Sequence, residues 1–149
     1  MTATTFTRDE LLVAPARFAV QRGVRFQDVD AAGIVFYARF FDMFHDAYAD
    51  YLAAYGSPLP EVIRARQWAA PLAHAEADFL APLRFGDTVE VALVAGRLDG
   101  SRLSVGYRMT RGSVACAVGV TVHVFVDVAS FKKIPPPAEA AAALAPLLG

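Results

Sequence analysis

The sequence predicts an α+β fold in which a curled antiparallel β-sheet wraps around one long central helix. Three observations predict it: a helical pattern of aromatic residues between residues 35 and 55, a series of alternating apolar runs after residue 68, and turn signals between those runs. One long apolar helix followed by about four antiparallel strands is the arrangement of the hotdog fold.

The helix is predicted by large residues that recur at three- and four-residue steps from Val35 to Tyr55. They are Tyr37, Phe41, Phe44, Tyr48, Tyr51 and Tyr55. Polar residues occupy only a narrow strip of this helix, so we expect other structure to surround most of it. Gly56 and Pro58 end the helix.

Strands are predicted where apolar residues alternate with other residues. Such runs cover residues 18–26, 68–80, 88–95, 103–109 and 118–126. Turn signals such as Phe85-Gly86-Asp87 and Asp99-Gly100-Ser101 separate the later runs. The runs therefore predict an antiparallel meander.

Length and composition predict a single domain over residues 1–149. We assign residues 1–16 to an N-terminal extension and residues 135–149 to a Pro/Ala-rich C-terminal tail with a possible short helix. The chain is 56% hydrophobic, enough for a real core. The mean hydropathy of +0.38 is high for a small domain, which indicates apolar surface hidden between subunits. We expect an oligomer.

Charge and cysteine content exclude several function classes. The net charge is -1, without the basic surface of a nucleic-acid binder. Cys116 is the single cysteine, so neither an intrachain disulfide nor a cysteine-based metal site is expected. The polar N-terminus lacks a secretory pattern, and the apolar run from Val114 to Val128 is short for a membrane span. We expect a cytoplasmic protein without membrane contact.

The segment from Arg25 to Tyr37 carries the residues best suited to chemistry. Asp30 supplies a carboxylate just before the helix, where unpaired backbone N–H groups and a partial positive charge collect. Gly33 permits close approach of a ligand to those groups. A carboxylate beside an oxyanion site suits thioester hydrolysis. An Asp before a helix can equally serve as an ordinary N-cap.

The stretch Asp28–Arg39 resembles the signature of 4-hydroxybenzoyl-CoA-type thioesterases, which have the hotdog fold. The resemblance continues through Ala70–Leu72, Asp78-Phe79, Pro82 and Gly86-Asp87. In that family the second Asp of the Asp-x-Asp pair is the catalytic carboxylate, which implies Asp30, while Asp28 shapes the turn. The family forms dimers or tetramers with active sites shared across the dimer interface, so we expect a homodimer or a tetramer.

The resemblance also implies a mechanism and a substrate class. The Tyr37 backbone N–H would polarise the thioester carbonyl, and Asp30 would either attack it to form an anhydride or activate water. Tyr37 stands where related short-chain enzymes usually carry His, and Pro71–Ala75 is similar to aromatic acyl-CoA enzymes, including 1,4-dihydroxy-2-naphthoyl-CoA hydrolases. We therefore expect an aromatic acyl-CoA substrate and no cofactor.

Other candidate residues have weaker support. Trp68, Leu72 and His74 are candidate substrate-binding residues, although Trp68 also suits core packing and His74 also suits a polar surface or an interface. Arg102, Arg108 and Lys132 are candidates for the CoA phosphates, and solvated surface charge explains them as well. His45 and His123 lack partners at metal-ligand spacing, so no metal site is expected.

Three rival functions remain open at this stage. The first is a short-chain acyl-CoA thioesterase. The second is a dehydratase or hydratase with the same fold, although the His motif of such enzymes is not visible in this sequence. The third is a non-hydrolytic module that binds acyl thioesters.

Overall fold

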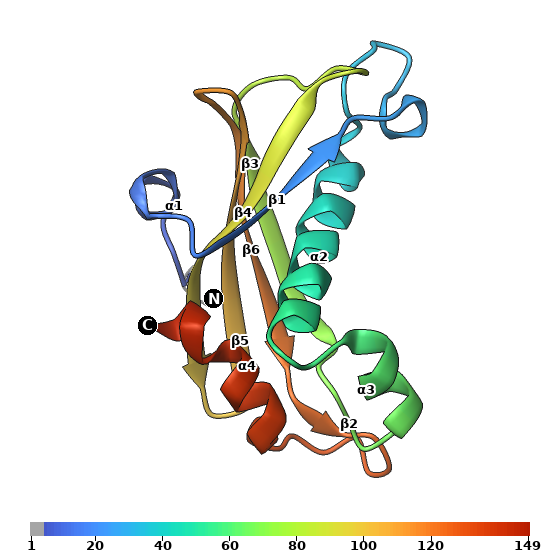
Figure 1. Ribbon diagram of the computed structural model, residues 1–149, viewed down its shortest axis with the longest axis vertical. Helices are drawn as coiled ribbons and strands as arrows, with labels where there is room; N and C mark the ends of the chain where they lie inside the picture. The colour runs from blue at the N-terminus through green and yellow to red at the C-terminus, as the bar shows by residue number, and fades with distance from the viewer. Residues whose placement is uncertain (1–4) are drawn as a thin grey trace.

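The computed structural model describes residues 5–149, and its centre is a five-stranded antiparallel sheet with α2 (Tyr37–Ala54) along one face (Figure 1). The strands are β1 (Phe18–Gly23), β3 (Leu72–Phe79), β4 (Thr88–Asp99), β5 (Arg102–Arg111) and β6 (Val114–Val124), in the order β1-β4-β5-β6-β3. Strands β1 and β3 are the two edges, so the sheet does not close around the helix. The hotdog fold is confirmed.

The remaining elements lie around this sheet and helix. They are α1 (Arg8–Val13), the 3-10 turn η1 (Phe26–Asp28), α3 (Leu59–Ala65), β2 (Trp68–Ala69), β7 (Val126–Asp127) and α4 (Ala138–Leu148). Strands β2 and β7 pair with each other and form a small second sheet. Within residues 5–149, no helix is long and apolar enough to cross a membrane.

The main core lies between α2 and the sheet. Phe44 is fully buried, and its ring stacks on Tyr107 of β5 with 4.8 Å between the ring centroids. Gly119 of β6 leaves the space for this ring, because a Cβ at that position would lie 2.5 Å from Phe44 Cε2. The opposite side of α2 is exposed at Asp42, Asp46 and other positions, so a single chain surrounds the helix only in part.

The opposite, convex face of the sheet is covered by α1, within the N-terminal extension (Figure 1). Leu11 packs over Gly106, where a Cβ would lie 2.5 Å from Leu11 Cδ2. Arg108 Nη1 donates to the carbonyls of Leu11, Leu12 and Ala14 at 2.8, 3.3 and 2.6 Å. These bonds satisfy carbonyls at the end of α1 that have no partner within the helix. The first four residues of the extension lie outside the described part of the chain.

The C-terminal residues contribute to the core. Ala140, Ala143, Leu144 and Leu147 of α4 are buried in the main core. The Tyr51 hydroxyl donates to the Ala143 carbonyl at 2.6 Å, which joins α4 to α2. The assignment of residues 135–149 as a tail therefore understates their role, because α4 closes one end of the core.

The run from Trp68 to Leu80 was expected to be one strand and is two. Strand β2 pairs with β7, whereas β3 pairs with β6. The break falls at Ala70-Pro71, where proline lacks the N–H that a continuous ladder needs. The interruption opens space beside Trp68.

A buried polar chain crosses the core beside this break. His123 Nδ1 lies 3.3 Å from the Ala70 carbonyl, which can only accept, so Nδ1 carries the proton. His123 Nε2 then accepts from the Thr121 hydroxyl at 3.0 Å, and Thr121 accepts from the Tyr107 hydroxyl at 2.8 Å. The imidazole also stacks on Tyr48. The chain thus requires a neutral His123.

We predict that Gly119→Ala destabilises the fold. The new methyl group would meet Phe44 and the Glu76 carbonyl at 3.0 Å or less, and overpacking of this kind costs about 1–3 kcal/mol. Thermal or urea denaturation measures the difference. Gly23→Ala is the matched control, since no heavy atom lies within 4 Å of its added Cβ. Equal stability of the two variants would contradict the close packing of α2 on β6.

We also predict a histidine-dependent loss of stability in acid. Burial lowers the pKa of His123 from 6.5 to about 4, so the unfolded chain binds this proton at a higher pH than the folded protein does. The contribution of neutral His123 is complete above pH 6.5 and is lost as the pH falls toward 4, by about 3 kcal/mol. Denaturation of the wild type and of His123→Gln across this range should show a smaller pH dependence in the variant.

Candidate active site

The loop before α2 is held by the buried carboxylate of Asp28. This side chain is 2% exposed, accepts from the Arg25 N–H at 2.9 Å and pairs with the Arg22 guanidinium at 3.3 Å. The Asp28 carbonyl accepts from the Phe36 N–H at 2.9 Å. Asp28 therefore fixes both the start of the loop and its return to the helix.

Asp30 lies at the exposed turn of this loop. Its Oδ1 accepts from the Ala32 N–H at 2.8 Å, and its carbonyl accepts from the Gly33 N–H at 2.9 Å. Gly33 has φ +81°, a conformation that favours glycine. The N-cap position of α2 belongs to Phe36, so Asp30 is not the ordinary helix N-cap considered as its alternative role. Its Oδ2 accepts no hydrogen bond from residues 5–149.

The first N–H of α2 is available to a ligand. Phe36 donates to Asp28 and Arg39 donates to Phe36, whereas no acceptor within the described chain takes the Tyr37 N–H. A free N–H at a helix N-terminus stabilises negative charge, because the helix dipole adds to the hydrogen bond. The structure thus places an unoccupied donor at the position expected for an oxyanion site.

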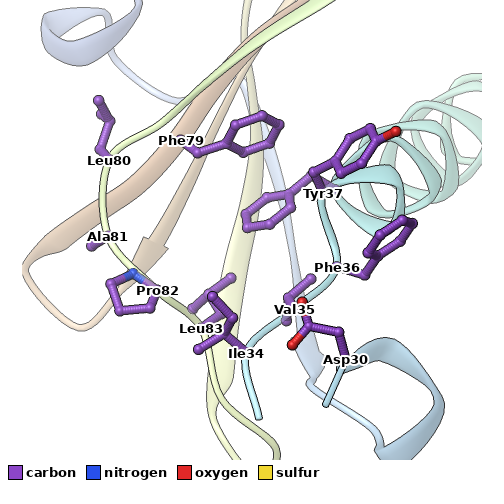
Figure 2. A pocket seen from close by; sticks show the side chains of 11 residues that line it. Asp30, Ile34, Val35, Phe36, Tyr37, Phe79, Leu80, Ala81, Pro82 and Leu83 are labelled. Carbon is purple, nitrogen blue, oxygen red and sulfur yellow. The ribbon is translucent and has the colours of Figure 1, made fainter. Parts of the chain in front are cut away.

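Asp30 and Tyr37 line the same cavity, of about 470 Å³, which we call the Asp30 cavity. Figure 2 shows the helix N-terminus on one side and the segment from Phe79 to Leu83 on the other. The ring of Phe40 meets that of Phe79 with 4.9 Å between centroids. The cavity is therefore mostly apolar, with the carboxylate of Asp30 as its charged group.

A second cavity, of about 460 Å³, lies farther along α2, and we call it the Trp68 cavity. Its walls include His45 and Tyr48 of α2, Trp68 of β2 and His123 of β6. Trp68 Nε1 donates to Glu139 Oε1 at 3.0 Å, so α4 fixes the orientation of the indole. The two cavities share no lining residue.

The predicted site residues fall into separate groups. Asp30 and Tyr37 line the Asp30 cavity, Gly33 bonds the Asp30 carbonyl within the same loop without lining the cavity, and Trp68 lines the second cavity. Leu72 and His74 of edge strand β3 line neither cavity, and His74 Nε2 lies 3.1 Å from Glu76 Oε1.

The expected CoA ligands do not surround Asp30 within one chain. Arg108 holds α1 on the convex face, where its guanidinium is already engaged, so we remove it from the candidate CoA ligands. Arg102 pairs with Val124 at one end of the sheet, whereas the Asp30 cavity lies at the other end, where Arg111 donates to the Pro82 carbonyl. Lys132 lies in the turn after β7, also away from Asp30.

Several cavity residues were not identified from the sequence. Leu80, Ala81 and Leu83 complete the wall of the Asp30 cavity, and the Pro82 turn was the signal that could have located them. Tyr48 was assigned only to the helix core, and Arg66 and Phe131 carried no pattern at all. Within residues 5–149, no group of three His, Cys, Asp or Glu side chains is arranged to hold a metal ion.

This chain is similar to known thioesterases in sequence and in fold. The profile of the Thioesterase-like superfamily matches residues 24–144. A 1,4-dihydroxy-2-naphthoyl-CoA hydrolase from Nostoc punctiforme is 34% identical over 116 residues, which are 78% of each chain. The crystal structure of a 1,4-dihydroxy-2-naphthoyl-CoA thioesterase from Synechocystis has a TM-score of 0.81 and 30% identity, covering 86% of this chain and 95% of that one.

A further solved structure has the same fold. A gentisyl-coenzyme A thioesterase has a TM-score of 0.75 and 28% identity, covering 84% of this chain and 98% of that one. The superfamily match spans the Asp30 loop, α2 and the six strands from β2 to β7, together with part of α4. This chain therefore belongs to the thioesterase-like superfamily of hotdog-fold proteins.

Proposed function

We propose that this protein hydrolyses the thioester bond of an aromatic acyl-CoA and releases the free acid and CoA. The observation that carries the proposal is the shared cavity of the Asp30 carboxylate and the unoccupied Tyr37 N–H. Two relatives cited above act on aryl thioesters by name, and their similarity to this chain extends over most of its length. The apolar walls of the cavity suit an acyl group better than a charged one.

In this mechanism the thioester carbonyl oxygen accepts a hydrogen bond from the Tyr37 N–H. The bond strengthens as the oxygen becomes negative, which lowers the barrier to attack on the carbonyl carbon. Asp30 then acts in one of two ways. Either Oδ2 attacks the carbon and expels the CoA thiolate, and water then hydrolyses the resulting anhydride to the free acid and the Asp30 carboxylate. Or Oδ2 takes a proton from a water that attacks the carbon, and the CoA thiolate leaves from the tetrahedral intermediate. Both routes use the same two groups, and neither uses a cofactor.

We predict that Asp30→Asn retains its fold and loses turnover by at least about 10²- to 10⁴-fold, because the amide is neither a base nor a competent nucleophile. Free-thiol release from benzoyl-CoA and 1,4-dihydroxy-2-naphthoyl-CoA measures the rate. Asp42→Asn is the matched control, since Asp42 is exposed on α2 and pairs only with Arg39. A wild-type rate for Asp30→Asn would exclude the carboxylate mechanism.

We further propose that two copies pair through β3. This strand is an edge of the sheet, and much of it is exposed, so it offers an edge along which a second strand can pair. A two-fold axis makes two identical strands antiparallel. The Pro71 end of β3 in one copy then lies beside the Phe79 end in the other.

This pairing joins the two cavities into one site. Pro71 lines the Trp68 cavity, and Phe79 lines the Asp30 cavity. The Trp68 cavity of one copy therefore adjoins Asp30 of the other and can receive the acyl group. Leu72 and His74 come to lie at the interface, and Arg102 and Lys132 come to the same end as the second copy's Asp30. The proposed dimer would therefore bring the candidate residues that one chain separates to the same region.

We predict that two inactive variants restore activity when mixed. Asp30→Asn removes the carboxylate, and Ala69→Phe fills the Trp68 cavity, so each homodimer should be inactive. Random heterodimers contain one intact composite site, so co-expression should recover about one quarter of the wild-type activity. Thiol detection on the co-expressed mixture measures this recovery, and heterodimers isolated with two different tags should show about one half of the wild-type activity. No recovery, with heterodimers present, would place the site within one chain.

Two rival functions are separated by the same thiol assay. Faster cleavage of short-chain than of aryl thioesters would favour a short-chain acyl-CoA thioesterase, and absence of thiol release from every acyl-CoA would favour a non-hydrolytic module. The apolar volume of about 460 Å³ beside Trp68 favours the aromatic substrate over a short acyl chain.

We place the reaction in the cytoplasm, as the single cysteine of the sequence suggests.

A further inference from the structure

The rim of the Trp68 cavity has two residues in an unusual backbone conformation. Within residues 5–149, only Arg66 and Phe131 combine a side chain with a positive φ, at 54° and 58°. Both line the Trp68 cavity, although they belong to segments 65 residues apart in sequence. Arg66 follows α3, and Phe131 ends the turn after β7.

This conformation has an energetic cost that glycine would avoid. A left-handed backbone brings Cβ close to the carbonyl oxygen, which is unfavourable for a residue other than glycine. Neither side chain offsets the cost by packing in the core, because both are exposed. Arg66 is the C-cap of α3, where a left-handed residue is common, although glycine or asparagine usually occupies it. Residues in this conformation also cluster at ligand sites, and here both side chains border one cavity.

The polar groups of the cavity are of two kinds. Both ring nitrogens of His123 are already engaged, by Ala70 and Thr121. By contrast, the Arg66 guanidinium and the Tyr48 hydroxyl form no hydrogen bond to any residue of the described chain, although Tyr48 is only 4% exposed. His45 lies against Tyr48 with 6.0 Å between ring centroids. The cavity therefore offers a cation and an accessible hydroxyl, at the end of an otherwise buried side chain, to an incoming group.

We propose that Arg66, Tyr48 and Phe131 select an aryl group that carries a hydroxyl or carboxylate remote from the thioester. This inference rests on the proposed function and on the composite site. The flat ring lies against Trp68 and Phe131, whose aromatic faces suit it. The guanidinium binds the remote oxygen by a charge-assisted hydrogen bond, and the Tyr48 hydroxyl donates a second. Arg66 and Tyr48 are thus specificity-determining residues rather than catalytic ones.

The test uses three thioesters that differ at one position: benzoyl-CoA, 4-hydroxybenzoyl-CoA and 4-carboxybenzoyl-CoA. Arg66→Asn keeps a residue that tolerates the left-handed conformation, and Tyr48→Phe removes only the hydroxyl. We expect Arg66→Asn to lower kcat/KM for the 4-carboxy substrate by about tenfold or more, and that for benzoyl-CoA by less than about twofold. Tyr48→Phe should act mainly on the 4-hydroxy substrate.

Thermal stability supplies an independent readout, because a merely structural role of Arg66 predicts that Arg66→Asn lowers the Tm. Arg66→Asn relieves backbone strain, so its Tm should stay constant or rise by about 2–4 °C while selectivity falls. Arg64→Gln is the matched control: Arg64 belongs to the last turn of α3, is exposed and does not line the cavity. Unchanged selectivity in Arg66→Asn, or an equal change in Arg64→Gln, would overturn the inference.

A binding experiment separates failure of this inference from failure of the proposed function. Titration calorimetry with terephthalate and with benzoate needs no turnover. The inference expects terephthalate to bind the wild type more tightly than benzoate, and this preference to disappear in Arg66→Asn. If wild-type protein cleaves no acyl-CoA, the proposed function fails and the calorimetric preference still decides the role of Arg66. Equal binding of both acids to both proteins overturns it.

Discussion

The packing of α2 into the concave face of the sheet is the constraint on which the rest of the structure depends. Phe44 fits beside Gly119 and stacks on Tyr107, which fixes the helix against β5 and β6. With the helix fixed, its first turn lies next to the end of β3, where Phe40 meets Phe79. The Asp30 cavity is the space between that first turn and the segment after β3. The position of the Tyr37 N–H is therefore determined by apolar packing several turns away, and the polar loop has only to bring Asp30 to it.

Local sequence patterns made α2, the strands and the Asp30 loop predictable. The aromatic period from residue 35 to residue 55 identified α2, and alternation identified the strands, because both depend on neighbouring residues alone. The Asp30 loop was located by a continuous motif, and its internal bonds also lie within that segment. The shape of the Asp30 cavity was harder to predict from the sequence. Leu83 is distant from Asp30 in the sequence, and only the fold brings it to the cavity wall.

What the sequence did not reveal depends on contacts between distant segments. The Ala-rich α4 has a weak apolar pattern, yet Tyr51 and Trp68 both donate hydrogen bonds to it. Arg108 was a plausible phosphate ligand by charge and spacing, and only the fold shows its guanidinium held by the carbonyls that end α1. The break at Pro71 was visible as a residue, but its effect on pairing required β7 to be found as the partner of β2. Each case involves partners more than about 50 residues apart, beyond the reach of periodicity.

The separation of the two cavities has a consequence for how such a protein can change its substrate. The groups proposed to cleave the thioester belong to one loop and the helix start after it, where Asp28 is buried and Asp30 bonds its own turn. Groups that would contact the far end of the acyl chain belong to α2, to the residue that follows α3 and to the turn after β7. Because the two cavities share no lining residue, we expect substitutions at Arg66 or Phe131 to alter the proposed acyl site without moving the carboxylate. The backbone strain at those two positions therefore lies where a change of side chain affects selectivity most and the chemistry least.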